Sequence, residues 1–201
     1  MILTGAIAHL PDDSPSAMQK RPVTDAVRLG RSGFAGDEQA DRRFHGGPDQ
    51  ALHYYPTEHY AALAAHFLAL TRFGPGDLGE NLSEHGWLET DVRLGDVFTL
   101  GPCSIEASQP RVPCHKIAKR LDEPEAPAFV AASARVGWYF RVIESGIITP
   151  GDSLRLIERS EATPKDRTTL AHPPRTRRRP RPDPRLGQPP RTRQSLACQV
   201  H

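Results

Sequence analysis

The sequence predicts a mainly β fold: a small β-barrel with a few peripheral helices, followed by an irregular tail rich in proline and arginine. The first observation behind this prediction is that strand-like runs in residues 1–160 are short and are separated by Gly, Pro and Asp. The second is that residues 161–201 hold eight of the 20 prolines and show neither helical nor strand periodicity. We therefore expect one folded domain over residues 1–160 and a disordered basic tail over residues 161–201.

The predicted strands follow one another through the whole domain. They cover residues 4–9, 26–29, 97–100, 104–108, 138–143 and 153–157. Two of them come after turns of the same construction, Leu94-Gly95-Asp96 and Pro150-Gly151-Asp152. Because Gly and Asp favour turns and the runs that follow alternate in polarity, each of these segments is typical of a half-buried strand.

Two segments predict helices rather than strands. The clearer one begins at Thr57, whose hydroxyl is expected to cap residues 58–68 behind Pro56. Its apolar face is expected to comprise Tyr60, Leu63, Ala64 and Phe67. The second covers the alanine-rich residues 126–134, which we expect to pack on the barrel. We interpret both helices as structural.

Charge is distributed unevenly along the chain. Its net charge of +2 combines about +7 in residues 161–201 with about −5 in residues 1–160. The basic tail is compatible with nucleic-acid binding, but the acidic domain offers no surface for it, so we do not expect a nucleic-acid partner. Three cysteines without a CxxC pair predict neither a disulfide framework nor a zinc site. With no apolar run of membrane-spanning length, a cytoplasmic protein in a reducing compartment is expected.

The two cysteines of the domain have different surroundings. Cys103 lies in an apolar run and is expected to be a buried structural residue. Cys114 has Arg111, His115 and Lys116 as neighbours. These basic or ionisable groups favour the thiolate, which is the nucleophilic and metal-binding form of cysteine. Cys114 is therefore the candidate reactive residue.

Glycine-rich polar segments at 36–39, 44–49 and 79–81 accompany the cysteine segment 108–116. Glycine lets backbone N–H groups approach an anion closely. No GxxxxGK[ST] or GxGxxG run is present, which argues against a P-loop or Rossmann nucleotide site. Four histidines lie within 22 positions, but their spacing matches no zinc template. They are His45, His53, His59 and His66.

Taken in order, these motifs resemble the YiiM-like MOSC family over residues 4–158. The motifs are Gly-Asp-Glu-Gln, His-Gly-Gly-Pro-Asp, His-Tyr-Tyr-Pro, Gly-Glu-Asn-Leu, Leu-Gly-Asp, Ser-Gln-Pro-Arg-x-Pro-Cys and Val-Gly-Trp-Tyr-Phe-Arg-Val. The resemblance implies a MOSC-type β-barrel that binds the molybdenum cofactor (molybdopterin). It also implies reduction of N-hydroxylated bases such as 6-N-hydroxylaminopurine to amines, as a detoxification activity.

The resemblance also implies the roles of individual residues. Cys114 matches the family's catalytic cysteine, the protein ligand to molybdenum, and Arg111 is expected to hold the pterin phosphate. Asp49 and Asn81 are expected to hydrogen-bond the pterin. The full set of expected cofactor-binding residues is Asp37, His45, Gly46, Gly47, Asp49, Gly79, Glu80, Asn81, Arg111, His115 and Lys116.

The electron donor implied by the resemblance is a separate NAD(P)H-dependent flavoprotein reductase, because the chain shows no flavin or Fe–S signature. An alternative is a sulfur carrier in which Cys114 receives a persulfide from a pyridoxal-phosphate-dependent desulfurase. The tail departs from the small helical appendage usual in the family. A shifted reading frame would explain its composition, and resequencing the end of the gene would test this hypothesis.

Overall fold

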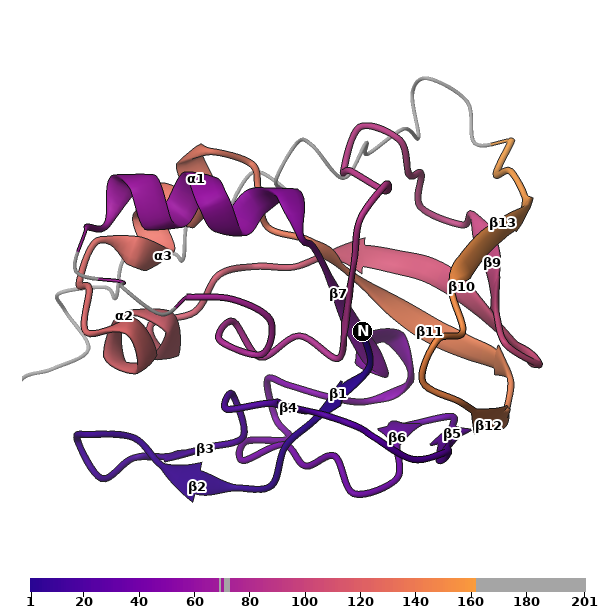
Figure 1. Cartoon of the computed structure of the whole chain (residues 1–201), viewed down its shortest axis with the longest axis horizontal. Helices are drawn as coiled ribbons and strands as arrows, with labels where there is room; N and C mark the ends of the chain where they lie inside the picture. The colour runs from indigo at the N-terminus through magenta and orange to yellow at the C-terminus, as the bar shows by residue number, and fades with distance from the viewer. Residues whose placement is uncertain (69, 71–72, 162–201) are drawn as a thin grey trace, which may run out of the picture.

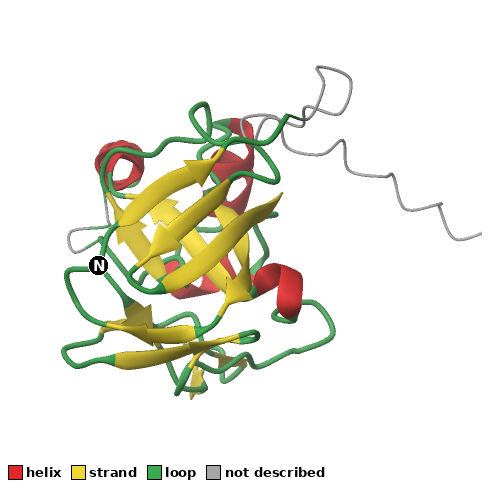
Figure 2. Ribbon diagram, turned by 90° about the vertical axis from the view of Figure 1, so that its right-hand side faces the viewer, coloured by secondary structure: helices red, strands yellow, loops and turns green. Residues whose placement is uncertain are grey.

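The computed structural model describes residues 1–68, 70 and 73–161 and is mainly β, as the sequence predicts (Figure 1). A six-stranded sheet in the order β13-β9-β10-β11-β7-β8 curls into a half-barrel (Figure 2). Its strands are β7 (Leu52–Pro56), β8 (Leu82–Glu84), β9 (Val97–Leu100), β10 (Cys103–Pro110), β11 (Trp138–Glu144) and β13 (Leu154–Glu158). Neighbours are antiparallel except β7 and β8, which are parallel.

Three smaller sheets accompany the half-barrel. They are formed by β12 (Gly146–Ile148) with β5 (Val27–Gly30) and β6 (Gly33–Phe34), by β1 (Leu3–Thr4) with β4 (Arg21–Pro22), and by β2 (Ala8–His9) with β3 (Pro15–Ser16). The helices are η1 (Pro48–Gln50), α1 (Glu58–His66), α2 (Lys116–Leu121) and α3 (Ala126–Ala132). In Figure 1 the three α-helices gather at one end of the large sheet, and β1 to β6 lie beneath it.

Most predicted strands occur within two residues of their expected bounds, and β9 matches its prediction residue for residue. The predicted strand 4–9 is wrong as a continuous element, because the chain forms β1 and then β2 with a break between them. At this break Gly5 approaches the Gln19 backbone so closely that a Cβ would lie 2.6 Å from its carbonyl oxygen.

Strand β7 was not predicted, because all five of its residues are buried and its sequence does not alternate. Tyr54 points into the barrel core and stacks on Trp138 with ring centroids 4.4 Å apart. Tyr55 points the other way, into a second core with Leu63 of α1 and Val130 of α3. The sequence of a strand that is covered on both faces is a continuous apolar run and does not alternate in polarity.

Both predicted helices are present, with small differences. On α1 the face with Tyr60, Leu63 and Phe67 is buried as predicted, while Ala64 is half-buried. The predicted Thr57 cap is wrong: Thr57 makes no capping hydrogen bond, and its hydroxyl donates to the Glu58 carboxylate at 3.4 Å instead. The short helix α2, which begins two residues after Cys114, was not predicted.

Near residue 160 the chain is held to the barrel, because the Ser160 N–H donates to Asp96 at 2.8 Å. The predictions made for the tail fall outside the described residues, apart from residue 161. Within the described ranges, no helix has the length and apolar character that crossing a bilayer requires.

Candidate functional site

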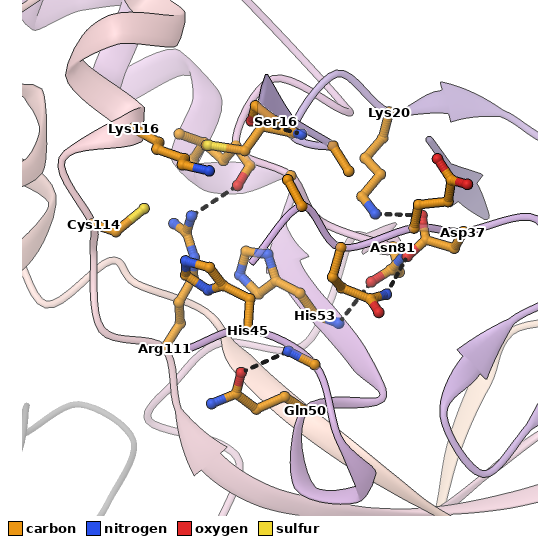
Figure 3. A pocket seen from close by; sticks show the side chains of 18 of the residues that line it. Ser16, Lys20, Asp37, His45, Gln50, His53, Asn81, Arg111, Cys114 and Lys116 are labelled. Carbon is orange, nitrogen blue, oxygen red and sulfur yellow. Dashed lines mark hydrogen bonds and ion pairs between the residues drawn. The ribbon is translucent and has the colours of Figure 1, made fainter. Parts of the chain in front are cut away.

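A pocket opens where the loops before β8 and after β10 meet the segment that follows β3 (Figure 3). It encloses about 610 Å³ of space between protein atoms, part of it open to solvent. Eight residues of the predicted cofactor site line it: Asp37, His45, Gly46, Gly79, Asn81, Arg111, Cys114 and Lys116. The structure therefore brings together four sequence segments that lie up to about 80 positions apart.

Cys114 is half-buried in this pocket, just before α2. Burial by itself raises the pKa of its thiol, but the hydrogen bond to His45, the charge of Arg111 and the backbone N–H of Lys116 outweigh burial. Together these groups lower the pKa of Cys114 to about 7. A substantial fraction of the thiol is therefore ionised near neutral pH.

Arg111 reaches the pocket from the end of β10 and is only 6% exposed. Its Nη2 donates to the Leu78 carbonyl at 2.9 Å, and its backbone N–H donates to the Gly137 carbonyl at 3.1 Å. Its Nη1 is buried and has no hydrogen-bond partner within the described part of the chain. Since an unpaired buried guanidinium nitrogen is costly, this atom is suited to an anionic ligand in the pocket.

Asp37 and Asn81 are held by bonds within the protein. The side chains of Lys20 and Asp37 form an ion pair in which they are 5% and 2% exposed. Asp37 also accepts the Gly5 N–H and the Asn81 Nδ2, both at 2.9 Å. The Asn81 Oδ1 in turn accepts the His53 N–H at 3.1 Å. These side chains thus fix the pocket wall and have few polar atoms left for a ligand.

Four residues of the predicted site do not line the pocket: Gly47, Asp49, Glu80 and His115. Asp49 is exposed and pairs with Arg141 at 3.1 Å. His115 precedes α2 and is also exposed. Glu80 is fully buried behind the wall, where burial raises the pKa of its carboxyl against the opposing effect of its hydrogen bonds. Gly47 begins the turn of η1.

The pocket includes residues that were not in the predicted site, among them Ser16, Met18, Lys20, Gln50, His53 and Tyr139. Burial, together with the nearby Arg111 charge, holds the pKa of His53 well below its usual value, so this histidine is neutral. Lys20 carries no local sequence signal, because its importance comes from burial against Asp37, 17 positions later. His53 lies in the His-Tyr-Tyr-Pro motif, which was the available signal.

The four clustered histidines lie in different environments. His45 lines the pocket with Cys114 and lowers the pKa of its thiol, His53 lines the same pocket, His59 pairs with Glu89 at 2.7 Å, and His66 stacks on Phe129 at a centroid distance of 3.9 Å. Within residues 1–68, 70 and 73–161, no group of three His, Cys, Asp or Glu side chains is arranged to hold a metal ion.

Comparison with known proteins identifies the family. The model of the MOSC domain matches residues 41–155. The chain belongs to the MOSC domain family. It is 38% identical over 172 residues to the protein YiiM of Escherichia coli, with 85% of this chain and 77% of that protein covered. The crystal structure of YiiM from Geobacillus stearothermophilus is similar with a TM-score of 0.65 and 32% identity, covering 79% of this chain and 73% of that one. The resemblance to YiiM-like MOSC proteins is thereby confirmed.

A third relative gives a coarser indication of activity. A protein of Gibberella moniliformis named as a reductase is 34% identical over 146 residues, which cover 72% of this chain but only 26% of that protein. MOSC domains are associated with binding of the molybdenum cofactor. The pocket residues fit such a group, because Cys114 offers a soft thiolate and Arg111 offers an anion a nitrogen that has no hydrogen-bond partner among the residues described.

Proposed function

We propose that this protein is a molybdenum-cofactor-dependent oxidoreductase that reduces N-hydroxylated compounds to amines. Its substrates include N-hydroxylated nucleobases such as 6-N-hydroxylaminopurine. One observation carries the proposal: a cysteine whose pKa is lowered to about 7 shares a pocket of a MOSC domain with a buried arginine whose Nη1 has no partner among the described residues.

In this proposal each pocket residue has a separate task. Cys114 is the ligand to molybdenum, since its thiolate is a soft, anionic donor in this pocket. His45 and Arg111 keep its sulfur ionised, and Arg111 also binds the anionic part of the pterin through Nη1. The ion pair of Lys20 with Asp37 and the bonds of Asn81 hold the opposite wall rigid.

When bound, the cofactor would supply the two-electron chemistry of the reaction. The substrate R–NHOH takes up two electrons and two protons, its N–O bond breaks, and R–NH2 and water leave. A separate NAD(P)H-dependent flavoprotein reductase provides the electrons in this proposal.

The test combines metal analysis with turnover. Full-length protein from a host that makes the cofactor is expected to contain close to one molybdenum per chain and, with a suitable reductase, to reduce 6-N-hydroxylaminopurine. Cys114→Ser should lose this activity, whereas the matched variant Cys103→Ser should keep it, because Cys103 is fully buried in the barrel core. Parental turnover by the Cys114→Ser variant, or metal-free parental protein, would refute the proposal.

A second candidate is a sulfur carrier, favoured by the same half-exposed, acidic thiol. A thiolate of this kind also accepts a sulfur atom to form a persulfide. The donor would be a pyridoxal-phosphate-dependent desulfurase. Labile sulfane sulfur on Cys114 near one equivalent per chain, in protein that lacks molybdenum, would favour this function over reduction.

A further inference from the structure

The loop before β8 is organised by a buried carboxylate that does not itself line the pocket. Glu80 is fully buried and accepts three hydrogen bonds. The donors are the Tyr60 hydroxyl at 2.5 Å, the Leu78 N–H at 3.0 Å and the Gly76 N–H. Two of the three come from the loop itself, so the carboxylate sets the path of residues 76–78.

Two carbonyl groups of the same loop contact residues that line the pocket. The Leu78 carbonyl accepts the Arg111 Nη2 at 2.9 Å, and the Gly76 carbonyl accepts the Lys20 backbone N–H at 3.2 Å. Gly76 has a φ of 98°, and a Cβ there would collide with the Lys20 carbonyl oxygen. The loop therefore has little freedom to shift while these contacts persist.

We propose that Glu80 is a positioning residue that fixes the Leu78 carbonyl, and through it the guanidinium of Arg111, at the correct place beside Cys114. This inference rests on the proposed function only where it assigns Arg111 to the cofactor. Its structural content, a buried chain of contacts from Glu80 through Leu78 to Arg111, holds for any role of the pocket.

The ionisation of Cys114 reports on the position of Arg111, because the Arg111 charge is among the groups that stabilise the thiolate. In Glu80→Gln one carboxylate oxygen becomes an NH2 group that confronts a backbone N–H of the loop, so one donor is left without an acceptor. If Arg111 then moves away from Cys114, the pKa of the thiol rises. Loss of the negative charge of Glu80 alone would lower the pKa of Cys114. The direction of the pKa shift therefore distinguishes a movement of Arg111 from the direct electrostatic effect of the substitution.

The experiment measures the alkylation rate of Cys114 by iodoacetamide against pH, read by peptide mass spectrometry. Full-length protein from a host that cannot make the cofactor is used, so the result does not depend on reductase activity. We expect the pKa of Cys114 in Glu80→Gln to rise by about one unit, close to its value in Arg111→Ala. At pH 6 the rate should fall by up to about tenfold.

Two further variants complete the test. Tyr60→Phe removes one donor to Glu80 but leaves both loop N–H bonds, so the pKa of Cys114 should stay at the parental value. Gly76→Ala displaces the loop with the carboxylate intact and should raise that pKa. Protection of the buried Cys103 from alkylation shows that a variant is folded. If Glu80→Gln does not fold, the result for Gly76→Ala decides the test. An unchanged or lowered pKa in the folded loop variants would overturn the proposal, whatever the outcome of the turnover assay.

Discussion

Cys103 and Cys114 have the same thiol group, but they lie in two regions that shift its pKa in opposite directions. In the barrel core, burial raises the pKa of Cys103, and the negative charges of Asp152 and Glu144 raise it further. In the pocket, burial also acts to raise the pKa of Cys114, but His45 and Arg111 outweigh it and lower the value to about 7. The difference teaches that the hydrogen-bonding and cationic partners of a cysteine, rather than burial alone, decide whether it is reactive.

The largest expected effect is a difference in alkylation rate between the two cysteines. At pH 7 a thiol with a pKa of about 7 is about half ionised, while one at the ordinary value of 9.0 is about 1% ionised. Cys103 is also inaccessible, with 0% of its surface exposed. We therefore expect Cys114 in native metal-free protein to react at least about 50-fold faster with iodoacetamide, measured by peptide mass spectrometry. Equal rates would show that the two environments do not differ as described.

Arg111 and Arg141 extend the comparison from thiols to cations. Arg111 is 6% exposed, and its Nη1 has no hydrogen-bond partner in the described part of the chain. The Arg141 side chain, in contrast, is 42% exposed and forms ion pairs with Asp49 and Glu106. A charge-assisted hydrogen bond in a buried site contributes about 1.5–3 kcal/mol, or roughly 10- to 100-fold in affinity. Arg111→Ala should therefore lower molybdenum per chain strongly when the cofactor is limiting.

Arg141→Ala is the matched control for that measurement. Its exposed ion pairs contribute little, so we expect parental molybdenum content and a small change in stability. Equal metal content in the Arg111→Ala and parental proteins would show that Arg111 does not bind the cofactor.

The sequence located the pocket better than it located the functions of individual side chains. Local motifs predicted the segments at 36–39, 44–49, 79–81 and 108–116, because glycine and polar residues mark unusual backbone regardless of how the chain folds. The contribution of Lys20 could not be predicted, since its neutralising partner Asp37 becomes adjacent only in the folded protein. Strand β7 was missed for a related reason: two hydrophobic cores cover its opposite faces and erase the alternation that identifies a strand.

A smaller effect is expected at His45, whose hydrogen bond is the leading group that lowers the pKa of Cys114 against burial. In the parental protein the thiolate fraction should rise with pH through about 7 and level off above it. His45→Ala should move this profile to higher pH by up to about one unit, because the hydrogen bond to the ionised sulfur is lost. The shift is measured as the pH dependence of Cys114 alkylation. His66→Ala is the control, since His66 stacks on Phe129 and does not line the pocket.

The smallest effect is expected at Asp49, where the motif and the structure point to different roles. Its place in the His-Gly-Gly-Pro-Asp motif predicts a hydrogen bond to the pterin, but its side chain is 65% exposed and pairs with Arg141 outside the pocket. Asp49→Asn should therefore leave molybdenum per chain unchanged and alter the free energy of unfolding by no more than about 0.5 kcal/mol. Metal analysis and chemical denaturation measure the two quantities. A loss of molybdenum comparable to that of Arg111→Ala would show that the loop at 44–49 turns Asp49 toward the cofactor when it binds.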